Sequence, residues 1–89
     1  MRFEVLVEVR LRPGIADPQG ATIERALPAL GFDRVTNVAV GKAIRFTVDT
    51  ADEASARTLV EDLCHRFLTN PVIEDASIEI GAGLEGASR

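Results

Sequence analysis

The stretch of sequence that decides the fold is Leu11-Arg12-Pro13-Gly14-Ile15-Ala16-Asp17-Pro18-Gln19-Gly20. Pro13 and Gly14 fit the central positions of a type II turn, because proline fixes the first φ and glycine accepts the positive φ at the second. Asp17 offers a side-chain acceptor at a helix N-cap, and Pro18 suits the first helical position because it has no N–H group to leave unpaired. The stretch therefore predicts that a strand ends, the chain turns and a helix begins.

The sequence before this stretch alternates between apolar and polar residues. Every second residue over positions 3–11 is apolar: Phe3, Val5, Val7, Val9 and Leu11. Glu4, Glu8 and Arg10 lie between them. This period of two predicts a strand with one buried face.

The helix that begins at Pro18 is expected to have one apolar face and an early break. Its apolar residues follow the i, i+3, i+4, i+7 rule: Ile23, Ala26, Leu27 and Leu30. Gly31 provides a left-handed stop, with Phe32 as the hydrophobic contact beyond it. Pro28 removes a helical hydrogen bond and clashes with the preceding turn, so a kink or break is predicted there.

The middle of the chain predicts a hairpin. Val35, Val38 and Val40 form an extended segment, Gly41-Lys42 a turn, and residues 44–48 a strand with alternating apolar positions. The hairpin would place these two extended segments side by side in the sheet.

A second helix and a last strand follow. Thr50 and Glu53 fit a capping box at the start of the helix. The expected buried stripe of this helix is Ala56, Leu59, Val60, Leu63, Phe67 and Leu68. Asn70-Pro71 ends it, and a strand from Ile73 to Ile80 completes the domain.

The order of elements predicts the fold class. Strand, helix, strand, strand, helix and strand make the split β-α-β arrangement. We therefore expect a ferredoxin-like β-α-β-β-α-β two-layer α+β sandwich, with an antiparallel sheet and both helices on one face. Residues 1–80 would form the single domain, and residues 81–89 a mobile C-terminal tail.

Length and composition limit the class of protein. A chain of 89 residues buries only about two-thirds of its unfolded surface on folding, so a homodimer or higher homo-oligomer is expected. The apolar fraction of 46% and the net charge of −4 predict a soluble domain that does not bind nucleic acid. A single cysteine, no long apolar segment and no secretory signal indicate a cytoplasmic protein without membrane contact.

The residues that could carry chemistry are few. His65 and Cys64 are the single histidine and the single cysteine, so neither a histidine-based metal site nor a catalytic pair of histidines is expected. The carboxylates near the second helix start are explained by capping. A phosphate bound at the Pro18 helix start stays an alternative, with which the Asp17 carboxylate would compete. We expect no catalytic residue, no metal and no cofactor in this chain.

Several short motifs, in this order, resemble one known family. They are Val5-Leu6-Val7-Glu8-Val9, Arg12-Pro13-Gly14 with Asp17-Pro18-Gln19-Gly20, Gly31-Phe32, Val40-Gly41-Lys42, and Asn70-Pro71-Val72-Ile73-Glu74-Asp75. The resemblance that they carry extends over nearly the whole chain, from Phe3 to about Ile80. The sequence resembles the PurS family, the small subunits of phosphoribosylformylglycinamidine synthase (EC 6.3.5.3).

The resemblance implies a noncatalytic subunit in de novo purine biosynthesis. Its partners would be a glutaminase subunit, which releases ammonia, and an ATP-dependent synthetase subunit, which uses it. The small subunit would bridge the two and support ammonia transfer, and the whole complex would use ATP, Mg and glutamine. The alternative is a regulatory module of the ACT type that binds small molecules, which Gly14 and Asp17 in the first loop would fit. A stand-alone enzyme fits worst, because no nucleophile and base lie in register.

Under this resemblance, two segments are expected to contact the larger subunits. The partner-binding residues would be Arg12, Pro13, Gly14, Asp17, Pro18, Gly20, Asn70 and Pro71. Arg12 would be a charged anchor, and the prolines would lower the cost of ordering on binding. The same residues also have a purely structural interpretation, in which they only shape turns.

Overall fold

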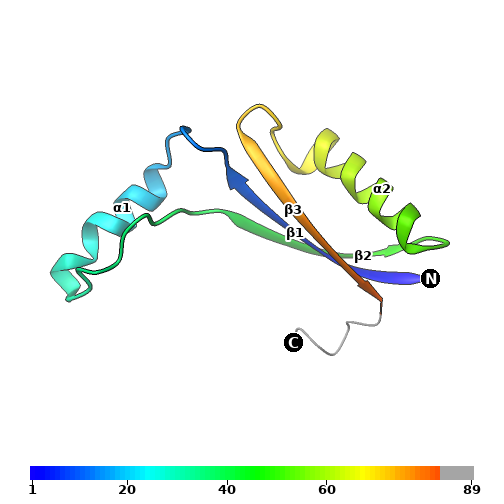
Figure 1. Ribbon diagram of the computed structural model, residues 1–89, viewed down its shortest axis with the longest axis horizontal. Helices are drawn as coiled ribbons and strands as arrows, with labels where there is room; N and C mark the ends of the chain where they lie inside the picture. The colour runs from blue at the N-terminus through cyan, green and yellow to red at the C-terminus, as the bar shows by residue number, and fades with distance from the viewer. Residues whose placement is uncertain (83–89) are drawn as a thin grey trace.

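The computed structural model describes residues 1–82, which form three strands and two helices (Figure 1). The elements are β1 (Arg2–Leu11), α1 (Pro18–Ala26), a 3-10 turn (Pro28–Leu30), β2 (Lys42–Asp49), α2 (Glu53–Leu63), a π-helical turn (Cys64–Leu68) and β3 (Glu74–Ala82). The sheet has the order β2-β1-β3, and both pairs are antiparallel.

β1 is the central strand, and its predicted alternation is confirmed. Phe3, Val5, Val7 and Val9 are each at most 3% exposed, whereas Glu8 and Arg10 on the other face are exposed. Val7 lies opposite Ile44 of β2 and Ile78 of β3, so the inward rows of the three strands coincide. The core therefore lies on one face of β1.

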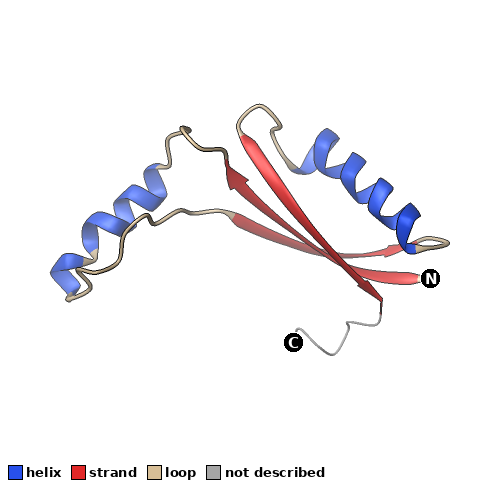
Figure 2. Cartoon of the chain, viewed as in Figure 1, coloured by secondary structure: helices blue, strands red, loops and turns tan. Residues whose placement is uncertain are grey.

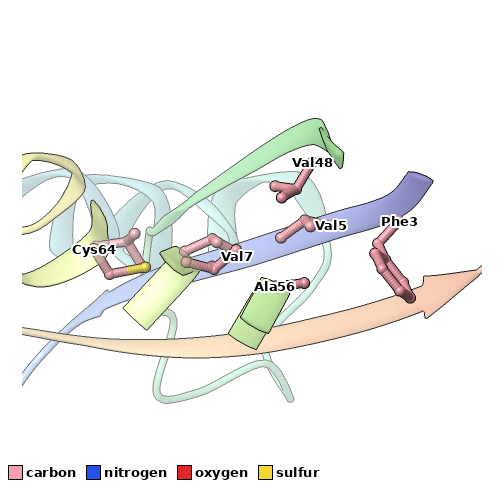
Figure 3. Packing of buried hydrophobic residues seen from close by; sticks show 8 residues of the cluster. Phe3, Val5, Val7, Val48, Ala56 and Cys64 are labelled. Atoms are coloured by element: carbon pink, nitrogen blue, oxygen red, sulfur yellow. The ribbon is translucent and has the colours of Figure 1, made fainter. Parts of the chain in front are cut away.

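α2 covers this face with a narrow stripe. Ala56, Val60 and Cys64, spaced four residues apart, are buried against β1 (Figure 3). The wider stripe expected from the sequence is wrong in part, because Leu59 is 46% exposed and Phe67 is 80% exposed. Only one residue per turn of α2 is fully buried.

The N-terminus of α2 differs from the expected capping box. The N-cap is Asp52, whose Oδ1 accepts a hydrogen bond of 2.8 Å from the backbone N–H of Ser55. Thr50 instead donates its hydroxyl hydrogen to the carbonyl oxygen of Asp52, over 2.9 Å. A carboxylate two residues later thus takes the role expected of the threonine.

The turns around α1 follow the sequence closely. Gly14 has φ 87°, and the N–H of Ile15 donates to the carbonyl of Arg12, as a turn centred on Pro13-Gly14 requires. The predicted break at Pro28 is confirmed, because α1 ends at Ala26 and a 3-10 turn follows. Gly31, with φ 93°, ends that turn.

The expected hairpin does not form, which corrects the predicted fold class. Residues 33–41 are irregular, so the order is β-α-β-α-β rather than the ferredoxin-like β-α-β-β-α-β. The amide groups of Val38 and Val40 donate to the carboxylates of Glu24 and Asp17, which replace a neighbouring strand. Asn37 has φ 60°, which interrupts an extended chain.

The two helices also lie differently from the expected two-layer sandwich. α2 packs over the sheet, whereas α1 projects beyond the end of the sheet together with the returning segment (Figure 2). We call residues 17–41 the arm. The radius of gyration is 16.5 Å, and a compact domain of this length would have about 12 Å. The arm is therefore not folded back onto its own sheet.

The last strand ends slightly later than expected. β3 continues through Ala82, two residues beyond the predicted strand end at Ile80. The rest of the expected tail, residues 83–89, lies outside the described residues.

The core predicts a large effect of truncating Phe3, which is 2% exposed. Phe3→Ala removes the largest side chain of the core, so the free energy of unfolding should fall by about 3–5 kcal/mol. Urea unfolding at a fixed protein concentration measures this. Val72→Ala, at a side chain 77% exposed, is the control and should change the value by less than about 0.5 kcal/mol. Equal losses in the two variants would contradict this core.

Candidate partner-binding site

The structure brings two of the predicted segments together at one end of the sheet. The backbone N–H of Arg12 donates to the carbonyl of Ile73 over 2.8 Å. The Arg12 Nε lies 3.4 Å from Asp75 Oδ1, and both side chains are about half exposed, at 46% and 47%. We call residues 12–16 and 69–73 the loop end. Arg12, Pro13, Gly14, Asn70 and Pro71 all lie in it.

Asn70 holds its half of the loop end in one conformation. Its side-chain Oδ1 accepts a hydrogen bond of 3.1 Å from the N–H of Val72. Its carbonyl accepts from the N–H groups of Ile73 and Glu74, and its own N–H donates to Glu74 Oε1 over 2.8 Å. This side chain stabilises a tight turn around Pro71, as asparagine does in Asx turns. The turn-shaping role expected from the sequence is therefore enough to explain Asn70. The surface beside Asn70 stays available for contact with another protein.

Exposed apolar side chains lie within the loop end and in the turn that precedes it in the chain. Val72 is 77% exposed and Ile15 is 38% exposed, and Phe67, in the π-helical turn that precedes Thr69, is 80% exposed. Side chains of this size in water are typical of protein-binding surfaces when charged groups surround them. The half-exposed Arg12–Asp75 pair provides such charge.

Sequence reasoning missed Phe67 as a surface residue. In a regular α-helix, Phe67 would lie seven residues after Val60 and so on the same, buried face. The π-helical turn closes with a hydrogen bond from the Thr69 N–H to the Cys64 carbonyl, which adds a residue to the turn and rotates Phe67 outward. No signal in the sequence marks this turn.

Asp17, Pro18 and Gly20 lie at the base of the arm rather than in the loop end. Asp17 Oδ1 accepts from the Gly20 N–H, and Asp17 Oδ2 accepts from the Val40 N–H, each over 2.9 Å. Gly20 is buried, and a Cβ there would lie 2.5 Å from the Val38 carbonyl oxygen. The Asp17 carboxylate thus occupies the helix start that a bound phosphate would need.

The two hydrogen bonds also set the charge of Asp17. The hydrogen bond from the Gly20 N–H has the largest effect on the carboxyl of Asp17, and the bond from the Val40 N–H has the next largest. Both hold the pKa of this carboxyl below its usual value. Ser55 acts in the same way on Asp52 at the start of α2. Both caps are therefore ionised at neutral pH.

The pKa of the Cys64 thiol is shifted upward, in contrast to the lowered pKa values of the two aspartates. Its side chain is buried against the sheet, and burial raises the pKa of the thiol, with a further contribution from the negative charge of Glu61. The reactive thiolate form is therefore disfavoured at neutral pH.

Residues 1–82 contain neither a cluster of metal-binding side chains nor a membrane-spanning helix. No group of three histidine, cysteine, aspartate or glutamate side chains within that range is placed to hold a metal ion. No helix in the same range combines the length and the apolar character needed to cross a bilayer.

The fold defines a small α+β protein with exposed apolar side chains at the loop end and on a projecting arm. Residues 4–82 match the family model for PurS, described as phosphoribosylformylglycinamidine (FGAM) synthase. The chain belongs to the PurS family of FGAM synthase subunits, and the predicted resemblance is confirmed. This membership replaces the alternative of an ACT-type module.

Curated relatives match over most of their length. The PurS subunit of FGAM synthase from Synechocystis sp. is 42% identical over 85 residues, which cover 96% of this chain and 84% of that protein. The PurS subunit from Methanothermobacter thermautotrophicus is 42% identical over 80 residues, or 90% of this chain and 94% of that protein.

Solved structures show the same fold. The PurS subunit of Thermotoga maritima matches with a TM-score of 0.84 at 30% identity, covering 91% of this chain and 93% of that chain. A chain in the structure of PurLQS from the same organism also matches with a TM-score of 0.84 at 30% identity, covering 91% of this chain and 99% of that chain. The β-α-β-α-β chain is thus similar to PurS folds determined by experiment.

The lowered pKa of Asp17 predicts an acid-dependent loss of stability. Because its pKa in the folded chain lies below the usual 3.8, the ionised carboxylate stabilises the fold above that value. This stabilisation is lost as the pH falls below 3.8 and through the lower, folded-state pKa. Asp17→Asn cannot titrate, so its free energy of unfolding, measured against pH, should fall less steeply there. A variant curve parallel to that of the wild type would contradict this role.

Proposed function

We propose that this chain joins a glutaminase subunit and an ATP-dependent synthetase subunit of FGAM synthase in the cytoplasm, and that it supports ammonia transfer between them. The observation that carries the proposal is the match of residues 4–82 to the PurS family. The likeness to a chain within PurLQS of Thermotoga maritima supports the assembly. ATP, Mg and glutamine act in the larger subunits, and this chain contributes shape and attachment.

The chemistry of ammonia gives a physical reason for such a subunit. Ammonia released into bulk water is protonated and diluted, and the ammonium ion is not a nucleophile. The sites that release and use ammonia therefore need a closed path that excludes water. A small rigid subunit that docks on both large ones holds the two ends of that path in register.

The loop end is the surface of this chain that contacts the larger subunits. Its two segments are tied together by the Arg12–Ile73 backbone hydrogen bond, so little order has to be gained on binding. Val72 supplies apolar area and Arg12 supplies a charged anchor within the loop end, and Phe67 adds apolar area in the turn that precedes it in the chain. Asp17, Pro18 and Gly20 contribute indirectly, because they shape the base of the arm.

The arm docks on a second copy of the chain, which makes the protein a homodimer. Its exposed apolar side chains are Ile23 at 45%, Leu30 at 68%, Phe32 at 56% and Val35 at 46%. The segment that carries these side chains lies beyond the end of the chain's own sheet (Figure 1), so a second molecule is needed to remove them from water. The small core of the single chain makes this association favourable.

Reconstitution tests the proposed function. The glutaminase and synthetase subunits are combined with and without this chain, and FGAM formation is measured with glutamine or with ammonium chloride as the nitrogen source. Glutamine-dependent formation should require the chain, while ammonia-dependent formation should not. Full glutamine-dependent activity in its absence would overturn the proposal.

Reversal of the charge at Arg12 tests its contact with the large subunits by copurification. Arg12→Glu should leave the chain folded, because the residue is half exposed, and should weaken copurification with the large subunits. The matched control is the double variant Arg12→Glu/Asp75→Arg, which restores the internal ion pair with its charges reversed. If Arg12 contacts a partner, the control stays defective; recovery of copurification would assign Arg12 a purely internal role.

Light scattering after size exclusion tests the dimer. The wild-type chain should have the mass of two copies. The double variant Leu30→Asp/Phe32→Asp should have the mass of one, because association would transfer two carboxylates from water into the interface. Val72→Asp, which lies in the loop end, is the control and should stay dimeric. A wild-type mass of one chain at every concentration would contradict the dimer.

A further inference from the structure

The amides of the returning segment of the arm have unusual partners. Val38 donates its N–H to Glu24 Oε1 and Val40 donates its N–H to Asp17 Oδ2, each over 2.9 Å. Alternate residues of an extended chain direct their N–H groups to the same side, so these two amides belong to one edge. In a sheet, carbonyl groups of a neighbouring strand would satisfy them. Two carboxylates from the helical half of the arm do so here.

Asp17 joins the two halves of the arm. Its Oδ1 accepts from Gly20 in the first turn of α1, and its Oδ2 accepts from Val40 where the chain returns to the sheet. Glu24 lies seven residues further along, which is two helical turns, so both carboxylates lie on the same side of α1. The helix and the returning segment are thus connected near both ends of α1.

The backbones of the two halves also meet without side chains between them. A Cβ on Gly20 would lie 2.5 Å from the Val38 carbonyl oxygen, and Gly20 is the buried residue of α1. At the end of the returning segment, a Cβ on Gly41 would lie 2.5 Å from the Val9 carbonyl oxygen. Only glycine allows these approaches, so the arm closes on itself and then joins β1 through close backbone contacts.

We infer that Asp17 and Glu24 are positioning residues that clamp the two halves of the arm into one rigid unit before it docks. The inference rests on the proposed docking of the arm on a second copy. A preformed arm brings its exposed apolar side chains to the partner already arranged, so less conformational freedom is lost on association. Without the clamp, residues 33–41 have no strand partner to hold them beside α1.

Hydrogen exchange of individual amides tests the clamp in the full chain. In the double variant Asp17→Ala/Glu24→Ala, the amides of Val38 and Val40 should exchange about tenfold faster or more, because hydrogen bonds to charged groups are lost. The matched control is Asp52→Ala, which removes the cap of α2, a hydrogen bond of 2.8 Å to Ser55 within its own helix turn. In the control, exchange at Val38 and Val40 should be unchanged.

A second variant keeps the test decisive if the loss of the Asp17 cap unfolds α1. Glu24→Ala leaves that cap intact and places a good helix former inside α1, so circular dichroism should be unchanged. Exchange should then rise at Val38 while Val40 keeps its bond to Asp17. Unchanged exchange at Val38 in this variant would overturn the clamp, whatever the oligomeric state.

The dimer dissociation constant measures the effect of the clamp on docking. It should rise about tenfold or more in Asp17→Ala/Glu24→Ala and stay unchanged in Asp52→Ala. Faster exchange with an unchanged dissociation constant would overturn the positioning role. A wild-type chain that is monomeric at every concentration would instead overturn the proposed dimer, and the exchange rates would still decide whether the clamp exists.

Discussion

The double pairing of β1 is the constraint on which the rest of the structure depends. β1 bonds to β2 along one edge and to β3 along the other, and its inward residues supply half of the fully buried side chains of the described chain. A shift of one residue in either pairing would bring the outward side chains of one strand beside the inward side chains of the other and would divide the apolar face. The position of α2 follows, because only the apolar face of this sheet offers area for its narrow stripe. The loop end follows too, because β1 and β3 run antiparallel and bring the turn after Leu11 beside the turn before Glu74.

Much of this arrangement could be predicted from local sequence signals. The alternation in β1, the turn at Pro13-Gly14, the cap at Asp17 and the break at Pro28 each depend on a residue and its immediate neighbours, and each is found as expected. The failures depend on distant partners. Residues 33–41 have the composition of a strand, but their amides meet carboxylates brought in by α1, which no local pattern reveals.

The same distinction applies to the candidate site. Arg12 and Pro71 could be placed together from the topology, since the strands they border are neighbours. Asp17 and Gly20 share a motif with Arg12 in the sequence, yet the structure uses them inside the arm. A continuous motif thus serves two tasks, presentation of a surface and internal support. Under the proposed function both tasks have a common purpose, because a subunit that acts by attachment needs a defined surface and a rigid frame behind it.

The π-helical turn after α2 decides on which side of the chain a large side chain lies. It holds Cys64 in the interior and Phe67 outside, within a single turn of chain. If the same residues closed this turn with α-helical hydrogen bonds, Phe67 would lie seven positions after Val60 and would face the sheet, while every residue before the turn kept its place. The type of hydrogen bond that closes one turn thus decides whether a large aromatic ring lies in water or in the interior, with no change in the sheet.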